Sequence, residues 1–353
     1  MPIFKALLRD FPAASRAFLI ALAVTMGLLV GMRIMFHGEK PAFFLLGDSG
    51  ISGFRVVPGQ RIQDVLAYSN PDYRVMSWAE TGAMPLDYFM QYSRGCLLAG
   101  KPQTVVIAMS PDKFIECKNP HRFFSDGVNL RWIPWNRAGK DFIHILTPRE
   151  RNVALVQQAS MPFYAVAELG KYLWERYVEW PSDRAKMLNP SRARNAEVSL
   201  KAAESGKARD TLRIPDDQGF ANMPLARDGE FLLRTLREQG VETRVILLPI
   251  GNPDLIHATY SAHAQANLDT LKVRMRHWLE AQGQAYVDFN APEDAAHFTG
   301  ANWDDMNHLK SPAAFAYMAG RIAPLFSRPA ARNPQSRISL INPDGDGSQD
   351  KRK

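Results

Sequence analysis

Cysteine is scarce in this chain of 353 residues, and Cys96 and Cys117 are the only two. Two cysteines form at most one disulfide, which excludes a small scaffold held together by several disulfides. Cys96 lies in an apolar helical stretch, so a Cys96–Cys117 disulfide and a small buried side chain at Cys96 are both open. Neither cysteine has the neighbours expected of a metal ligand or of a nucleophilic thiol.

Clusters of basic residues and of histidines are missing as well. The formal net charge is +7, but Lys and Arg are spread out and do not alternate with aromatic residues as in nucleic-acid sites. This pattern argues against nucleic-acid binding and favours a basic envelope protein that meets anionic lipids or polymers. The eight histidines show no metal-ligand spacing, and no internal repeat is visible. We therefore expect no metal and no cofactor.

One long uncharged run is present near the start, from Ala17 to Met32. With the apolar residues beyond Arg33, residues 17–36 can span a bilayer if Arg33 snorkels. No Ala-x-Ala-like cleavage site follows, which favours an uncleaved anchor over a signal peptide. More basic residues precede the run than follow it, so residues 1–16 are expected in the cytoplasm and the rest in the periplasm or outside the cell.

Five apolar strand candidates alternate with helical stretches in the remainder of the chain. The strand candidates are Ala42–Leu46, Tyr73–Trp78, Thr104–Met109, Thr243–Pro249 and Ala285–Phe289. The helix candidates are Gln60–Tyr68, Pro85–Leu98, Asp228–Gln239, Ala262–Ala281 and Pro312–Phe326. Continuous β-branched and aliphatic runs are typical of parallel strands covered on both faces. The alternation predicts an α/β fold, a three-layer α/β/α sandwich around a central parallel five-stranded sheet.

This predicted domain covers residues 41–327 and carries an insertion at about 115–226. The insertion is aromatic in its first part and charged in its second. It is either a helical subdomain that buries its aromatic residues, or a lid or docking face with Trp132, Trp135, Phe142 or Trp174 exposed. Residues 328–353 are rich in Pro, Ser, Asn and Asp, and we predict a disordered tail.

Two short motifs far apart in the chain carry the candidate chemistry. Gly47-Asp48-Ser49-Gly50 follows the first strand candidate, and Asp305-Met306-Asn307-His308 follows the last. Ser49 is the candidate nucleophile, His308 the base that takes its proton, and Asp305 the group that orients the imidazole. Asp48 is expected to cap the turn through backbone N–H groups, so Gly47 and Asp48 support the nucleophile.

The placement of these motifs resembles the SGNH, or GDSL, hydrolase superfamily. The resemblance implies an oxyanion hole in which backbone N–H groups of Ser49 and Gly82 stabilise developing negative charge. The third donor of that superfamily is usually an asparagine in a Gly-x-Asn-Asp string, which is absent here. Ser110 stands after the third strand candidate instead, in Ser110-Pro111-Asp112-Lys113-Phe114, and could supply a hydroxyl group.

That Ser-Pro-x-x-Phe string resembles the DltD-like branch and the related AlgJ-like proteins, as do Leu248 to Pro253, Val287 to Phe289 and the late Asp-x-x-His-Leu. The resemblance implies a membrane-anchored acyltransferase or esterase outside the cytoplasm. It would place D-alanyl or acetyl esters on an envelope polysaccharide or teichoic-acid-like polymer. Its implied partners are a multipass membrane-bound O-acyltransferase and an acylated carrier or acyl-lipid donor. The alternative is a non-catalytic scaffold of the same fold that docks on such a transferase and positions its substrate.

Overall fold

The protein folds around one parallel β-sheet. The computed structural model describes residues 13–36, 40–52, 59–80, 82–114, 130–159 and 214–325. The five strands are β1 (Ala42–Leu46), β2 (Arg74–Ser77), β3 (Thr104–Met109), β4 (Glu242–Leu247) and β5 (Tyr286–Asp288). They are hydrogen-bonded in the order β2-β1-β3-β4-β5, and every pair is parallel. This arrangement confirms the α/β class and the central five-stranded parallel sheet.

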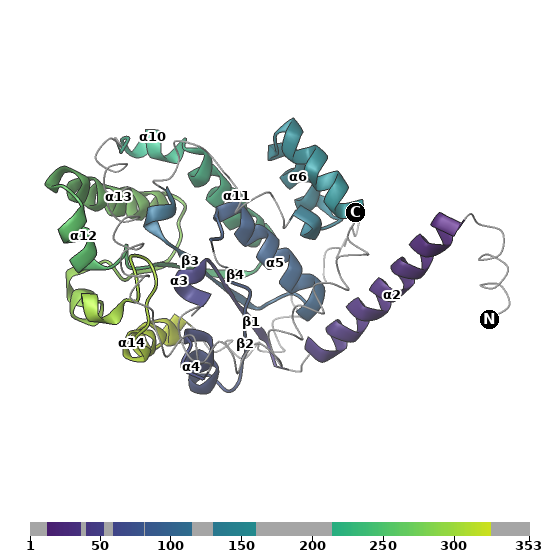
Figure 1. The fold of residues 1–353 in the computed structure, drawn as a ribbon, viewed down its shortest axis with the longest axis horizontal. Helices are drawn as coiled ribbons and strands as arrows, with labels where there is room; N and C mark the ends of the chain where they lie inside the picture. Colours follow the sequence, from purple (N-terminus) through teal and green to yellow (C-terminus); the bar gives the residue numbers. More distant parts are fainter. Residues whose placement is uncertain are drawn as a thin grey trace, which may run out of the picture.

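Helices cover both faces of the sheet (Figure 1). The helices are α2 (Ala13–Phe36), α3 (Ser49–Ser52), α4 (Ile62–Ser69), α5 (Pro85–Ala99), α6 (Arg137–Ile145), α10 (Asp217–Ala221), α11 (Pro224–Glu238), α12 (Pro253–Thr259), α13 (Ala262–Ala281) and α14 (Pro312–Ile322). In β1, Phe44 faces the core shared with α5, α11 and α13, and Phe43 faces the core shared with α4 and α14. Because successive side chains of a strand point to opposite faces, a strand between two helical layers is buried throughout.

The ends of the helices follow from local sequence. Ser261 begins α13 by accepting a hydrogen bond from the Ala264 N–H, and Ser311 does the same for Ala314 in α14. Helix α13 has the predicted bounds. Helix α11, in contrast, begins at Pro224 and not at Asp228, because proline suits the first turn and Leu225 is buried in the core. The predicted insertion therefore overlaps the start of a core helix at its C-terminal boundary.

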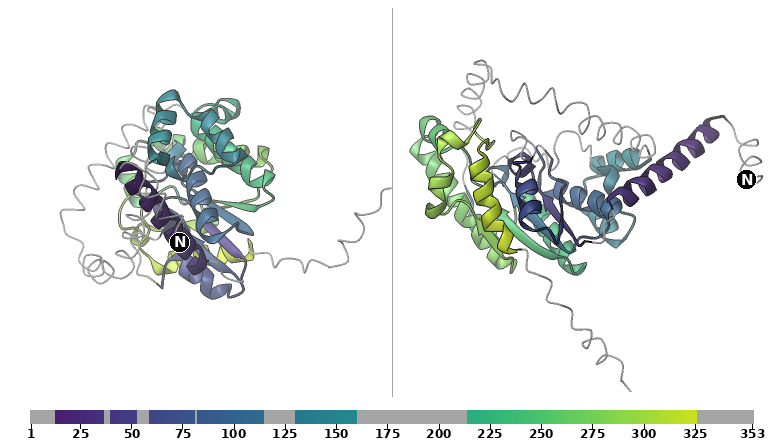
Figure 2. Two further views of the ribbon diagram at one scale, coloured as in Figure 1. Left: turned by 90° about the vertical axis from the view of Figure 1, so that its right-hand side faces the viewer. Right: turned by 90° about the horizontal axis from the view of Figure 1, so that it is seen from below.

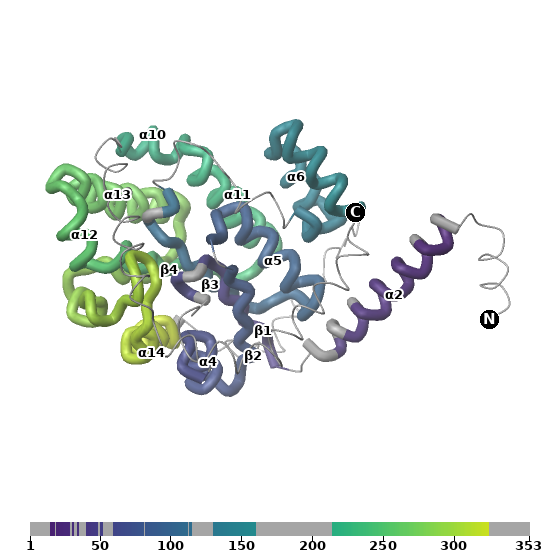
Figure 3. The backbone as a smooth tube through the Cα atoms, in the orientation of Figure 1, coloured from purple at the N-terminus to yellow at the C-terminus, as the bar shows by residue number. Residues whose placement is uncertain are grey.

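Helix α2 contains the predicted anchor segment. Part of it contacts α5, and the rest projects from the sheet domain, as Figures 1 and 3 and the right view of Figure 2 show. Several of its large apolar side chains are exposed, with Ile34 the most exposed at 71%. Within the ranges that the structure describes, no helix combines the length and the apolar character that a membrane crossing requires. The helix predicted for this segment is confirmed.

The described aromatic residues of the insertion are partly buried and partly exposed. Phe142 is fully buried, because its ring stacks on Phe89 of α5 with centroids 4.8 Å apart. Trp132 is also buried, and the Arg94 guanidinium lies over its ring at 6.0 Å. The prediction required only some of the four aromatic residues to be exposed, and these two are not. Trp135 is 92% exposed, and Trp174 lies outside the described residues.

Cys96 is a free thiol on α5. Burial raises its pKa to about 11, so the thiol stays protonated and unreactive at neutral pH. Cys117 and the predicted tail lie outside the described residues.

Candidate active site

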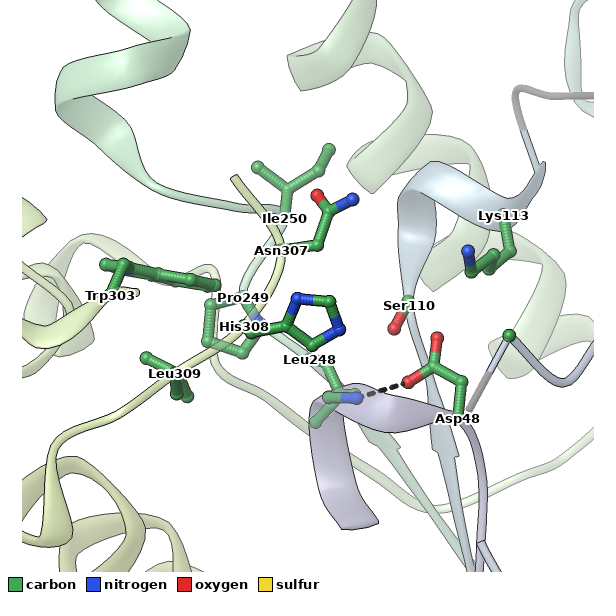
Figure 4. A pocket seen from close by; sticks show the side chains of 12 residues that line it. Asp48, Ser110, Lys113, Leu248, Pro249, Ile250, Trp303, Asn307, His308 and Leu309 are labelled. Atoms are coloured by element: carbon green, nitrogen blue, oxygen red, sulfur yellow. Dashed lines mark hydrogen bonds between the residues drawn. The ribbon is translucent and has the colours of Figure 1, made fainter. Parts of the chain in front are cut away.

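A pocket of about 180 Å³ lies at the carboxyl edge of the sheet (Figure 4). In the order 2-1-3-4-5, β1 and β3 leave the sheet on either side of the point where the strand order reverses, which is where open parallel sheets bind ligands. Segments after four strands supply the walls, and the chain before α14 completes them. The lining residues are Asp48 and Gly50 after β1, Gly82 after β2, Ser110 and Lys113 after β3, Leu248 to Ile250 after β4, and Trp303, Asn307, His308 and Leu309.

The turn that carries Ser49 is held tightly. Gly47 has a φ of 152°, and an added Cβ would lie 2.8 Å from Cγ2 of Ile51 and 2.9 Å from Cβ of Ala108. Only glycine fits this combination of backbone conformation and close packing. The Gly47 N–H donates to Oε1 of Gln91 at 2.9 Å, and Nε2 of Gln91 donates to the Gly47 carbonyl at 2.8 Å. A buried side chain of α5 thus fixes the residue from which the nucleophile turn departs.

Asp48 has the predicted supporting role. It is 2% exposed, and its Oδ1 accepts the Gly50 N–H at 2.8 Å. Ser49 follows as the first residue of α3, directly after the turn. The structure therefore places the Ser49 backbone at the edge of the pocket, between two lining residues, while its side chain lies outside the described part of the chain.

Asp305 and His308 form the predicted pair. Nδ1 of His308 lies 2.7 and 2.8 Å from the two carboxylate oxygens of Asp305. Oδ1 of Asp305 also accepts the backbone N–H groups of Asn307 and His308, each at 2.9 Å. Burial acts to raise the Asp305 pKa, but the hydrogen bonds and the charge of His308 outweigh burial, and the pKa is lowered.

The contact with Asp305 determines which chemical role the His308 imidazole can take. An ionised carboxylate only accepts hydrogen bonds, so Nδ1 of His308 carries the proton that it shares with Asp305, and in the neutral imidazole Nε2 is the acceptor. In Figure 4 the His308 ring lies in the middle of the pocket, with Trp303 and Leu309 on one side and Ser110 and Lys113 on the other. The ring is therefore placed to act as a base on a group inside the pocket.

The loop that carries His308 is fastened to the sheet edge. The Asn252 N–H donates to the Met306 carbonyl at 2.8 Å, and Trp303 pairs with Leu309 in an antiparallel bridge. Asn252 is buried and does not line the pocket. Its side chain accepts N–H groups of Asp254 and Leu255 and so begins α12. Asn252 therefore supports the site from behind.

The two other predicted oxyanion donors both line the pocket. Gly82 has a φ of 76°, a left-handed conformation that suits glycine, and Ser110 is largely buried at the end of β3. The loop before Gly82 is tied to the nucleophile turn, because the Glu80 N–H donates to the Gly47 carbonyl at 3.1 Å. An ion pair between Glu80 and Arg94 adds a second connection, to α5. Ser49, Gly82 and Ser110 therefore come from three neighbouring strand ends around one pocket.

Sequence reasoning missed three features of this site. Gln91 is a buried polar residue of α5, which signals that it has a hydrogen-bonding role but does not identify the partner. Lys113 lies within the quoted Ser-Pro-x-x-Phe string, yet nothing in the string shows that the lysine reaches the pocket. The segment from Leu248 to Ile250 was predicted as a strand end, and its place on the pocket wall was not predicted.

No family model and no curated protein matches this chain. Among solved structures, an extracellular lipase from Streptomyces rimosus is similar with 13% identity and a TM-score of 0.38 over 81% of this chain and 98% of that one. A carbohydrate acetylesterase family member from Sinorhizobium meliloti has 12% identity and a TM-score of 0.36 over 81% and 97% of the two chains. Scores this low do not identify a fold or an activity, and we draw no conclusion from them.

Proposed function

We propose that this protein is a serine acyltransferase or esterase that works through an acyl-enzyme at Ser49. One observation carries the proposal. The Asp305–His308 pair has the geometry of a base and its orienting carboxylate, and His308 lines the same pocket as Asp48 and Gly50, which flank Ser49 in the chain. The resemblance of the two motifs to the SGNH hydrolases supports the same chemistry.

The first half of the proposed reaction forms the acyl-enzyme. His308 Nε2 takes the Ser49 hydroxyl proton while the oxygen bonds to the carbonyl carbon of the donor ester. The carbonyl oxygen becomes an oxyanion, which the backbone N–H groups of Ser49 and Gly82 and the Ser110 hydroxyl are proposed to stabilise. The bond to the leaving oxygen then breaks, and His308 gives that oxygen the proton. Asp305 stabilises the imidazolium in between.

The second half reverses these roles. An acceptor hydroxyl loses its proton to His308 and attacks the acyl carbon, and Ser49 leaves with that proton. If the acceptor is water, the product is a free acid and the protein is an esterase. If it is a sugar or polyol hydroxyl, the product is a new ester and the protein is a transferase.

The proposal for the cellular role rests on the sequence alone. We propose that the chain acts outside the cytoplasm, attached to the membrane through residues 17–36, and esterifies an envelope polymer with D-alanyl or acetyl groups together with a multipass O-acyltransferase. Reporter fusions test this location. A reporter placed after Lys353 that is active only in the cytoplasm contradicts it.

The activity is tested with Ser49→Ala and His308→Ala in the full-length protein. Both variants should lose esterase activity on an activated acetate ester and polymer acylation in cells, while their folding is unchanged. The exposed Ser69 on α4 and the exposed His144 on α6 provide matched controls, Ser69→Ala and His144→Ala, which should keep full activity. Normal polymer acylation by Ser49→Ala would contradict the enzyme and favour the non-catalytic scaffold.

A further inference from the structure

Five apolar residues line the proposed active-site pocket and form what we call its apolar wall. They are Leu248, Pro249, Ile250, Trp303 and Leu309. All of them except Pro249 are at most 8% exposed. Leu248, Trp303 and Leu309 also belong to the core that the sheet shares with α4 and α14. The apolar wall is therefore the outer side of a packed core, and a group that pressed into it would meet close-packed side chains.

Trp303 is the largest side chain of the apolar wall, and it is held at several points. Its indole Nε1–H donates to the Phe298 carbonyl at 3.1 Å, and its backbone N–H donates to the Gly300 carbonyl at 3.2 Å. Its backbone also pairs with Leu309 in the antiparallel bridge. Phe298 is itself buried and packs edge-on against the ring of Phe289. The indole therefore keeps its place unless these contacts break.

The proposed chemistry directs the acyl chain of a bound ester toward the apolar wall. In Figure 4, Ser110 lies on the opposite side of the His308 ring from Trp303 and Leu309. The carbonyl oxygen of the ester points to Ser110 and the other proposed oxyanion donors. The leaving oxygen must meet His308, and the polar carrier or polymer that it belongs to must reach solvent. The remaining substituent is the apolar acyl chain, which is favoured against apolar side chains.

The size of the pocket limits how long this acyl chain can be. The volume of about 180 Å³ is little more than that of a cavity of about 150 Å³ that holds one benzene molecule. The ester group itself takes part of this space.

We propose that the site selects acyl groups by length, and that the Trp303 indole sets the limit. Acetyl-sized groups are accepted, and chains of about six carbons are disfavoured because they collide with the apolar wall. The inference rests on the proposed function and narrows its substrates to short-chain esters.

Two esters that differ only in the length of the acyl chain test this inference. Hydrolysis of p-nitrophenyl acetate and p-nitrophenyl hexanoate by the purified full-length protein in detergent is measured, and each kcat/KM is divided by the spontaneous hydrolysis rate of the same ester. The wild type should prefer the acetate. Trp303→Leu should raise the ratio of hexanoate to acetate by about tenfold, because each methylene group that enters the new space contributes about fourfold. Trp303→Phe removes less of the side chain and should raise the ratio less.

This ratio does not depend on how much of a variant is folded, because both rates scale with the same amount of active protein. The matched control is Phe231→Leu. Phe231 is 4% exposed, as Trp303 is, but it belongs to the core shared with α5, α11 and α13 and does not line the pocket. Phe231→Leu should lower the melting temperature and leave the ratio unchanged.

Three results would overturn the inference. The first is a wild type that hydrolyses the hexanoate as well as the acetate. The second is a ratio that neither Trp303→Leu nor Trp303→Phe changes. The third is complete loss of activity in both variants while they remain folded, which would assign Trp303 to holding the His308 loop. If the wild type hydrolyses neither ester faster than Ser49→Ala, the proposed function fails, and the inference fails with it.

Discussion

The hydrogen bonds between Gln91 and Gly47 are the contact through which the core holds the nucleophile turn. Gln91→Leu removes both hydrogen bonds and replaces the glutamine with an apolar side chain of similar size. The Gly47 carbonyl keeps one donor, the Glu80 N–H at 3.1 Å, but the Gly47 N–H loses its acceptor at a fully buried position. A buried unsatisfied donor costs about 1–3 kcal/mol and a second lost hydrogen bond about 1 kcal/mol, so the free energy of unfolding should fall by about 2–4 kcal/mol.

Urea unfolding followed by circular dichroism measures this change as a shift of the midpoint at constant slope. The matched control is Gln218→Leu at an exposed position on α10, which should change the free energy of unfolding by less than about 0.5 kcal/mol. Esterase activity of the folded Gln91→Leu protein should fall through kcat, because the turn that carries Ser49 loses its fixed position. A loss of less than about 0.5 kcal/mol in Gln91→Leu would refute the idea that Gln91 holds the turn.

Two further predictions concern the rest of the site and the core. Asp305→Asn should lower the free energy of unfolding at pH 7 by roughly 1–3 kcal/mol, because hydrogen bonds to an ionised carboxylate are lost. The Asp305 pKa is lowered in the folded state. The difference in free energy of unfolding between wild type and Asp305→Asn is therefore complete above about pH 4 and disappears as the pH falls through the folded pKa. If urea unfolding gave the same stability difference between wild type and Asp305→Asn at pH 7 and at pH 3, the stabilising role of the ionised Asp305 carboxylate would be contradicted. Gly95→Ala should destabilise by about 1–3 kcal/mol, because the new Cβ would lie 2.5 Å from Cε2 of Phe44. Gly320→Ala in α14 has no atom within 4 Å of its Cβ and should be neutral or stabilising, and equal melting temperatures for the two variants would contradict this packing.

The strands β1 and β3 were predictable because they are buried on both faces. The predicted bounds of β1 and β3 match the structure. Their sequences are apolar or β-branched throughout, so each strand can be identified without knowing which strand pairs with it. The Asp305–His308 contact was also predictable, because a spacing of three residues brings both side chains to one turn. The strand order β2-β1-β3-β4-β5 was not predicted and comes from the structure.

Other features of the fold and the site depend on contacts between residues far apart in the chain, which no local sequence pattern encodes. The partner of Gln91 lies 44 residues away, so its role appears only when α5 is packed against β1. Phe142 was expected as a candidate for an exposed patch, but it meets Phe89 and Phe231 from two other helices. The reach of Lys113 into the pocket depends on how Phe114 packs against Phe220 and Trp278, both far along the chain.

The central claim is that Ser49 carries the acyl group, and mass spectrometry of the protein after rapid acid quenching tests this claim most directly. Full-length protein is mixed with an activated acetate ester, quenched and digested, and the peptide that contains Ser49 is measured. The account predicts an added acetyl mass on Ser49 in the wild type, accumulation of that species in His308→Ala only at a strongly reduced rate, and no added mass in Ser49→Ala. Turnover of the ester with no acyl group on Ser49, or equal turnover by Ser49→Ala, would contradict it.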